Sequence, residues 1–337
     1  MNKVLVTGAT GFLGYHVIKL LNQRGIRPRA LVSSTEDLSA SGLTQLDIDV
    51  VQGDVDDKIS LASACKGIDT IFHLKFGINL SAGAEAEKEL HEINVVGTRS
   101  LLDAATEAKV QTIVVSSSSL AVGLNREPKP LDETADWEAH RFDLPYAMSR
   151  RQAEMEALAR AEQTQSPSIV VINPSFTMGP EDFIGAPANK LIKTLGKGGF
   201  RFSIPIGFGC LDVRDYADGA LRAAEKGRHG KRYILSGHNV MPDQLITDVA
   251  GIAGVEPSSF MIPVPVWIVS PIIMLLGLWS KIKKQPPKVS RSILQLWNRH
   301  AWYDTSRALE DLDWKPRPLA DSIKDSLDWL RANESSG

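Results

Sequence analysis

The chain has 337 residues, of which 43% are hydrophobic and 23% charged, so it can bury the core of one large domain or two modest ones. Its formal net charge of −2, with no block of basic residues, argues against a nucleic-acid partner. Cys65 and Cys210 are far apart and fit neither a metal-binding spacing nor a disulfide framework. A strand is predicted so close to the N-terminus that no signal peptide fits before it, and we expect a cytoplasmic protein.

The first motif is a strand, a glycine-rich turn and a helix. Residues 4–6 form an uninterrupted, β-branched-rich apolar run, which is typical of a strand buried on both faces. Gly8, Gly11 and Gly14 follow, and apolar residues then recur at helical spacing through 17–21. A plain strand-to-helix turn is one interpretation. The strand, the turn, the helix and their N-terminal position together favour a second interpretation. In it, a dinucleotide pyrophosphate binds free backbone N–H groups at the helix N-terminus.

The turn reads Thr7-Gly8-Ala9-Thr10-Gly11-Phe12-Leu13-Gly14. It resembles the cofactor loop of the extended short-chain dehydrogenase/reductases, the NAD-dependent epimerase/dehydratase family. The similarity extends over nearly the whole chain, and residues 173–235 resemble the branch of dihydroflavonol reductases and hopanoid-associated sugar epimerases. The resemblance implies NAD or NADP as the cofactor. It also implies that six loop residues contact this cofactor: Gly8, Thr10, Gly11, Phe12, Leu13 and Gly14.

The ends of the next two predicted strands concern the adenosine half of the cofactor. The strand at 29–32 ends at Ser33, where an acid would bind a ribose 2′-hydroxyl and a base would bind a 2′-phosphate. A 2′-phosphate is less unfavourable beside the Ser33 hydroxyl than it would be beside a carboxylate. We therefore expect a preference for NADP, with NAD as the alternative. After the strand at 48–52, the resemblance implies that Asp54 and Val55 lie against the adenine. A helix N-cap or turn is the other interpretation of Asp54.

The fourth predicted strand, 69–74, is followed by a departure from the family pattern. His73 lies inside an apolar run, and we expect a core histidine with a satisfied ring rather than a catalyst. Relatives continue with two small residues beside the cofactor, whereas this chain has Lys75 and Phe76 after Leu74. We expect Leu74 and Lys75 to lie at the cofactor. An unpaired lysine is costly to bury, so Lys75 either reaches a phosphate or carboxylate or lies at a more open strand end.

Two further segments carry polar residues toward the carboxyl-terminal edge of the predicted sheet. Residues 92–98 are predicted to open a helix, and the resemblance places Asn94 on the cofactor side of the site. The fifth predicted strand, 112–115, ends in four serines, at the edge of a parallel sheet where ligands bind. By the resemblance, Ser118 hydrogen-bonds the substrate oxygen and Ser116 lies at the cofactor. A polar strand-end turn is the alternative role for the serines other than Ser118.

Tyr146 and Arg150 are four residues apart in a predicted helix that begins at Pro145, so they share one face of it. The family has Tyr-x-x-x-Lys here. The resemblance implies that the tyrosine exchanges a proton with the substrate oxygen, while the cation lowers the tyrosine pKa and holds the nicotinamide ribose. Arginine keeps the charge, but it is bulkier and never deprotonates. The electrostatic role is therefore expected to persist, whereas a proton relay through this side chain is not.

The second half of the chain completes the sheet and adds a smaller domain. A sixth strand at 168–172 leads into Asn173 and Ser175, which the resemblance places beside the nicotinamide. Residues 181–209 contain several Gly, Pro and Phe residues and are interpreted as a mobile loop that lines an apolar pocket or as an ordinary surface loop. A seventh strand is predicted at 231–235 and a helix at 242–253. We expect a cofactor domain of 1–173 and 210–236, and a substrate domain of 174–209 and 237–337.

Residues 257–280 contain no charged side chain and are mostly apolar, and three lysines follow by residue 284. The length alone would allow a membrane span. Pro263, Pro265 and Pro271 interrupt a helix, however, and flanking tryptophans and lysines are more typical of an interface. We therefore expect a buried helix or a dimer contact, with peripheral membrane contact through 257–284 as the alternative.

Together these features predict an α/β fold: a Rossmann-type, doubly wound parallel sheet of about seven strands with a smaller C-terminal substrate domain. The expected function is NAD(P)-dependent reduction of a carbonyl, or oxidation of an alcohol, on an apolar or mid-sized small molecule. A nucleotide-sugar epimerase or dehydratase is one alternative. A cofactor-binding sensor or scaffold with weakened catalysis is another, because of Arg150. We also expect a homodimer through the helices that start near Asn94 and Tyr146.

Overall fold

The computed structural model describes residues 1–79, 83–137, 144–199, 202–203, 206–256, 262–263, 271 and 299–334. Seven strands form the main sheet in the order β10-β6-β5-β4-β1-β2-β3, and all neighbouring strands pair in parallel. Their bounds are β1 Val4–Thr7, β2 Arg29–Val32, β3 Asp49–Gln52, β4 Thr70–His73, β5 Thr112–Ser116, β6 Ser168–Pro174 and β10 Lys231–Leu235. The predicted strands and the predicted fold class are confirmed.

Helices cover both faces of this sheet. On one face, α1 (Phe12–Gln23), α8 (Val213–Lys226) and α12 (Ser306–Leu312) pack on Val4, Val6 and other residues of the same strand faces. On the other face, α3 (Lys58–Cys65), α5 (Gly97–Glu107) and α6 (Pro145–Ala161) pack on Leu5, Ile71 and their neighbours. Alternate residues of the inner strands thus enter opposite cores, which explains why these strands read as continuous apolar runs, whereas the edge strand β3 is mostly exposed.

The remaining helices of the first half are α2 (Thr35–Ala40) and α4 (Ala84–Leu90). The helix predicted to open at residues 92–98 in fact begins earlier, because α4 runs through a π-helical turn at His91–Val96 directly into α5. Residues 84–90 contain three glutamates and a lysine, so they lack the apolar stripe from which the prediction was made. Short 3₁₀ turns lie at Leu43–Gln45 and Ser119–Ala121.

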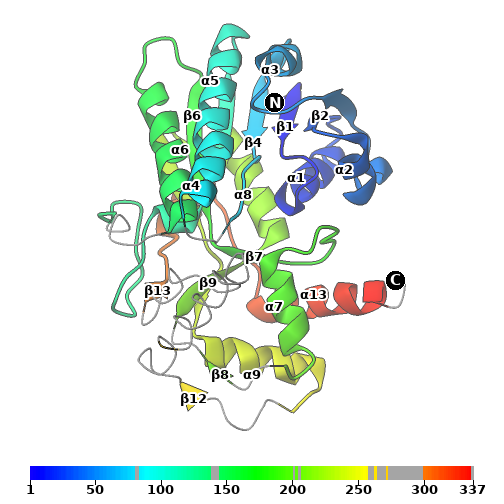
Figure 1. Cartoon of the computed structure of the whole chain (residues 1–337), viewed down its shortest axis with the longest axis vertical. Helices are drawn as coiled ribbons and strands as arrows, with labels where there is room; N and C mark the ends of the chain where they lie inside the picture. The colour runs from blue at the N-terminus through cyan, green and yellow to red at the C-terminus, as the bar shows by residue number, and fades with distance from the viewer. Residues whose placement is uncertain are drawn as a thin grey trace.

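A second core lies beyond the carboxyl-terminal edge of the main sheet, in the lower half of Figure 1. Its strands are β7 (Phe176–Met178), β9 (Gly207–Asp212), β11 (His238–Val240) and β13 (His300–Ala301), and β8 (Phe202–Ser203) pairs with β12 (Ile262–Pro263). Helices α7 (Pro187–Leu195), α9 (Pro242–Ala253) and α13 (Leu319–Glu334) pack around them. The predicted helix at 242–253 is confirmed, and the expected domain boundaries stay a prediction.

The interpretation of 181–209 as a loop is wrong in part, because α7 occupies its middle. Pro187 begins this helix at its first turn, and Ala188, Ile192 and Leu195 bury one face in the second core. The proline and the glycines suggested a loop, yet they lie at the ends of the helix, where both residue types are favourable. Phe183, before the helix, packs edge to face on Tyr15 and on Trp329.

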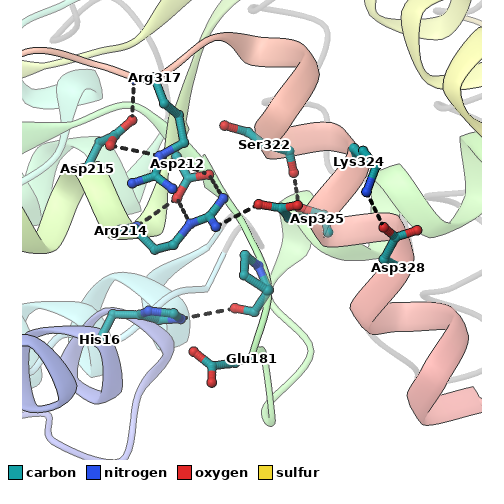
Figure 2. A network of polar contacts seen from close by, with 12 residues as sticks. His16, Glu181, Asp212, Arg214, Asp215, Arg317, Ser322, Lys324, Asp325 and Asp328 are labelled. Carbon is teal, nitrogen blue, oxygen red and sulfur yellow. Dashed lines mark hydrogen bonds and ion pairs between the residues drawn. The ribbon is translucent and has the colours of Figure 1, made fainter.

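A network of ion pairs joins the start of α8 to α13 (Figure 2). Arg214 donates to both carboxylate oxygens of Asp212 at 2.9 and 2.8 Å, and to Asp325 of α13 at 2.7 Å. Burial alone would raise the pKa of Asp212, but the hydrogen bonds and charge of Arg214 hold it below its usual value. Arg317 donates to Asp215 at 2.9 Å. These contacts fasten the C-terminal helix to the junction between β9 of the second core and α8.

Most of the apolar segment at 257–280 lies outside the described residues, so the expectations for it stay predictions. In the part of the chain that the structure describes, no helix is both long enough and apolar enough to cross a bilayer. Small residues on the helices that were expected to form a dimer contact lie inside the subunit: Ala105 of α5 and Ala153 and Ala157 of α6 are buried. The homodimer is therefore still only a prediction.

Candidate active site and cofactor cleft

The glycine turn between β1 and α1 leaves no space for a side chain at Gly8 or Gly14 but leaves more space at Gly11, which we call the outward glycine. A Cβ on Gly8 would lie 2.6 Å from the backbone of Leu74 and Lys75, and its φ of +67° is itself unfavourable for other residues. A Cβ on Gly14 would lie 2.2 Å from the Gly8 carbonyl oxygen. At Gly11, by contrast, the same carbonyl, at 3.2 Å, is the sole close neighbour among the described residues. Gly8 and Gly14 thus close the turn, and Gly11 leaves room above it.

The first turn of α1 has the properties of an anion site. Gly11 is its N-cap and makes no side-chain bond to it, and no acidic side chain lies in the first turn. The first N–H groups of a helix have no partner within it, and the helix dipole favours negative charge there. The Phe12 ring is buried against His16, so only its backbone can face a ligand. Thr10 and Leu13, which flank it in the turn, are half-buried.

Three of the expected cofactor residues converge from the ends of β2, β3 and β4. Asp54 accepts hydrogen bonds from Ser33 Oγ at 2.7 Å, from the Val55 N–H at 2.7 Å and from Lys75 Nζ at 3.1 Å. Lys75 also reaches to 3.4 Å from Ser33 Oγ. Burial would raise the pKa of Asp54, but these donors hold it below its usual value. Asp57, rather than Asp54, caps helix α3.

Leu74 and His73 are buried beneath the strand ends rather than exposed at them. Leu74 is buried in the core beside Gly8. The His73 ring lies between Thr7 Oγ1 at 2.8 Å and Thr98 Oγ1 at 3.0 Å. Because Thr98 gives its own proton to the Asn94 carbonyl, His73 Nε2 must be the donor to Thr98. Burial and then the charge of Arg150 lower the pKa of His73 to about 3. The expected neutral core histidine agrees with this geometry.

Asn94 ties the segment after β4 to helix α6. Its Oδ1 accepts from the Gly77 N–H at 2.8 Å, and its Nδ2 donates to Ser149 Oγ at 2.9 Å. Ser149 in turn donates to the Tyr146 carbonyl at 2.9 Å. The Asn94 side chain is fully buried, so its direct role is structural, and it can reach a cofactor only through what it positions.

The expected catalytic residues come from the end of β5 and the first two turns of α6. Ser118 caps the 3₁₀ turn after β5 by accepting from the Leu120 N–H at 3.2 Å. Among the described residues, no acceptor takes the Ser118 hydroxyl proton, so it is free for a substrate oxygen. Tyr146 lies at the start of α6, which packs on this 3₁₀ turn, and its side chain is half-buried.

Arg150 is 2% exposed and lies one turn after Tyr146. Its Nη2 donates to the Ser116 carbonyl oxygen, and its guanidinium lies over the Phe76 ring, with Cζ 4.8 Å from the ring centre. In the described part of the chain its Nε has no hydrogen-bond partner. Burial lowers the pKa of this guanidinium, and the nearby Tyr146 opposes that effect. A buried donor without a partner calls for an explanation, and a contact with a ligand is one that stays a prediction here.

Asn173 lies behind Ser118, at the end of β6. Its Nδ2 donates to the Ser118 carbonyl at 3.0 Å and to Glu154 at 2.7 Å. Glu154 is fully buried and also accepts from Arg232 at 2.8 Å. Ser175, the other residue expected here, is buried, and its Oγ has no partner among the described residues. Asn173 Nδ2 therefore supports the serine turn, while Asn173 Oδ1, like Ser175 Oγ, is buried without a partner among the described residues.

The structure thus forms two clusters at the carboxyl-terminal edge of the sheet, one at β2–β4 and one at β5 and α6. The roles of their residues stay predictions. Sequence reasoning missed Glu154 and the contact of Phe76 with Arg150. The position of Glu154, four residues after Arg150 on the same helix, was the available signal for the first. Among the described residues, no group of His, Cys, Asp or Glu side chains is arranged to hold a metal ion.

Comparison with known proteins agrees with this arrangement. The sequence model of the NAD dependent epimerase/dehydratase family matches residues 4–236. A Synechocystis sp. protein named as a dihydroflavonol 4-reductase is 28% identical over 335 residues, 97% of this chain and 94% of that protein. Sterol demethylase protein B of Methylococcus capsulatus is 27% identical over 329 residues, 97% of this chain and 98% of that protein. The crystal structure of gox2253 is 30% identical, with a TM-score of 0.83 and 99% of both chains covered.

Proposed function

This chain belongs to the NAD dependent epimerase/dehydratase family, and on that premise we propose that it is an oxidoreductase acting on a small molecule. The proposed reaction is reduction of a carbonyl, or oxidation of the corresponding alcohol, with NADP or NAD. The observation that carries the proposal is the pairing of a free Ser118 hydroxyl proton with Tyr146 and the buried cation Arg150. The reductase name of the Synechocystis relative supports the same reaction class.

The residues present fit a dinucleotide. Gly11 leaves open space over the N–H groups of α1, whereas a Cβ at Gly8 or Gly14 would meet backbone. Arg150 Nε and Ser175 Oγ are buried donors without partners among the described residues. The pyrophosphate would bind the α1 turn, and the nicotinamide ribose would meet Arg150. The cofactor, when bound, supplies or accepts the hydride.

The protein's own groups would manage the proton and the developing charge. Tyr146 would donate its phenolic proton to the substrate oxygen during reduction. Ser118 would hydrogen-bond that oxygen as it becomes an alkoxide. The Arg150 charge would favour the ionised form of Tyr146 in the reverse direction, because a nearby cation stabilises a phenolate. Arg150 itself would keep its protons throughout.

We propose NADP as the preferred cofactor. Lys75 brings an ammonium to 3.4 Å from Ser33 Oγ, at the end of β2 where the ribose 2′ position is recognised. The chain has no acid at Ser33 itself. Asp54 now holds this ammonium, so a 2′-phosphate would have to compete with that carboxylate for Lys75. This competition makes the expected preference modest.

The proposed substrate is apolar or mid-sized. Support comes from the edge-to-face pair of Phe176 and Phe208, which follows Ser175 with ring centres 5.5 Å apart. The relative named for sterol demethylation is consistent with an apolar substrate. Phe183 does not contribute to such a lining, because it packs on Tyr15 and Trp329.

The test is an assay of the purified protein with NADPH and NADH against a panel of ketones, aldehydes and nucleotide sugars. We expect oxidation of the reduced cofactor in step with formation of an alcohol, and loss of both in Ser118→Ala. Epimerisation of a nucleotide sugar without net cofactor oxidation would instead support the epimerase alternative. If the parent binds cofactor but turns over nothing, while Arg150→Lys does, the chain is a cofactor-binding protein whose catalysis is weakened at Arg150.

A further inference from the structure

The Arg150 guanidinium is a buried cation that lacks a carboxylate. In the described part of the chain it forms no ion pair, and it contacts the Ser116 carbonyl and the face of Phe76. The titratable groups that interact with its charge are Tyr146 and Glu154 on α6, Tyr216 on α8 and His73 on β4. A buried charge is costly unless other groups replace its hydration. A carbonyl oxygen and an aromatic face are both electron-rich, and each can stabilise a guanidinium. The two contacts together therefore compensate for much of the cost of burying Arg150.

The two contacts also fix the orientation of Arg150. An aromatic ring stacked on a guanidinium leaves the edge of the group free for hydrogen bonds. Nη2 donates to Ser116, and Nε, whose N–H lies on the same edge of the guanidinium, has no partner among the described residues. Without the ring, the long side chain would gain rotamer freedom and the free Nε–H would no longer have a fixed direction.

The backbone around both residues is held by one side chain. Asn94 bonds both the N–H and the carbonyl of Gly77, directly after Phe76, at 2.8 and 3.3 Å. The same amide donates to Ser149, directly before Arg150. The buried Asn94 side chain thus fixes the backbone next to both the Phe76 ring and the Arg150 guanidinium. Phe76 and Arg150 are also the positions at which this chain departs from the small residue and the lysine of the resembling family.

We propose that Phe76 is a positioning residue for Arg150, whose ring holds the guanidinium so that its free Nε–H faces the nicotinamide ribose and its charge stays beside Tyr146. This inference rests on the proposed function, because it assigns the ribose to Arg150. It explains how an arginine serves at a position where relatives carry a lysine: the flat, forked group requires a flat surface, and Phe76 provides it.

The test compares Phe76→Leu with Phe76→Tyr, in the parent and in an Arg150→Met background. Leucine keeps an apolar contact but has no aromatic face, whereas tyrosine keeps the face. The readouts are the NADPH dissociation constant by calorimetry, the pH profile of turnover and the melting temperature. We expect Phe76→Leu to weaken NADPH about tenfold, the effect of a desolvated cation–π contact, and to move the Tyr146-dependent limb of the profile to higher pH. We expect Phe76→Tyr to remain within about twofold of the parent.

In the Arg150→Met background, the same Phe76→Leu change should have almost no further effect on either readout, because the cation is gone. Equal weakening in both backgrounds would overturn the proposal, as would Phe76→Leu with parental affinity and pH profile. Should Phe76→Leu fail to fold, Phe76→Met keeps the volume and takes its place. Absence of NADPH binding in the parent would refute the proposed function. If the parent binds NADPH and Phe76→Leu changes neither the affinity nor the pH profile, this inference alone is refuted.

Discussion

Replacement of Gly11 by valine separates cofactor binding from folding, because Gly11 is the outward glycine of the turn. Its backbone has φ −79° and ψ 164°, an extended conformation that a β-branched residue adopts easily. The new side chain meets the Gly8 carbonyl at 3.2 Å and no second close atom. The expected loss of unfolding free energy is therefore about 1 kcal/mol, the usual difference between a good and a poor N-cap.

The effect on binding should be larger. The isopropyl group would cover helix N–H groups that the pyrophosphate uses, and each hydrogen bond to a charged group is worth about 1.5–3 kcal/mol. Loss of one such bond corresponds to a dissociation constant roughly 10- to 100-fold higher for NADPH and NADH alike. Calorimetric titration measures this change, and urea unfolding measures stability.

Gly25→Ala is the matched control, at the other end of the same helix. Gly25 has φ +74° and open space around it, so alanine should cost about 1 kcal/mol of stability through the left-handed conformation and leave cofactor affinity unchanged. Gly14→Val, by contrast, should prevent correct folding, because its Cβ would lie 2.2 Å from the Gly8 oxygen. A folded Gly11→Val protein with parental affinity for both dinucleotides would show that the pyrophosphate does not bind at this turn.

Two other predictions follow from the structure, and a third, the dimer, comes from the sequence. Lys75→Met should weaken NADPH about tenfold and leave NADH nearly unchanged, since only the 2′-phosphate gains from the ammonium; equal losses for both would contradict the assignment. His73 has a pKa of about 3 in the folded chain and about 6.5 when unfolded, so its contribution to stability is complete above pH 6.5 and declines at about 1.4 kcal/mol per pH unit below it. Urea unfolding of His73→Asn between about pH 3 and 6.5 should show a weaker dependence of the unfolding free energy on pH than the parent shows. The same dependence in both proteins would contradict the low pKa of His73. Light scattering at micromolar concentration should give the mass of a dimer, and a strictly monomeric mass would exclude it.

The main sheet was predictable because each of its strands is a short, nearly continuous apolar run between helices of clear period. The helices that were misjudged lack that signal. Residues 84–90 are mostly charged or small, and α7 is flanked by Pro187 and by glycines that are equally common in loops. For α7, tertiary packing rather than local pattern decides that the segment is helical, whereas residues 84–90 consist of strong helix formers that a search for apolar periodicity does not detect.

The candidate site was predictable only to the level of which strand ends meet. Parallel topology places Ser33, Asp54 and Lys75 at one edge of the sheet. The hydrogen bonds among them depend on side-chain conformations, which the spacing of these residues in the sequence does not predict. The stacking of Phe76 on Arg150 is of the same kind. From the sequence these two residues were separate departures from the family pattern, and only the fold shows that they touch.

The central claim, that Tyr146 transfers the proton in an NAD(P)-dependent reaction, is tested most directly by Tyr146→Phe on a confirmed substrate. This change removes one hydroxyl at a half-buried position and leaves the glycine turn and Arg150 in place. Loss of a positioned general acid costs about 100- to 10,000-fold in turnover, so the account predicts a drop in kcat of this size with a parental dissociation constant for the cofactor. Turnover by Tyr146→Phe at the parental rate would contradict the account.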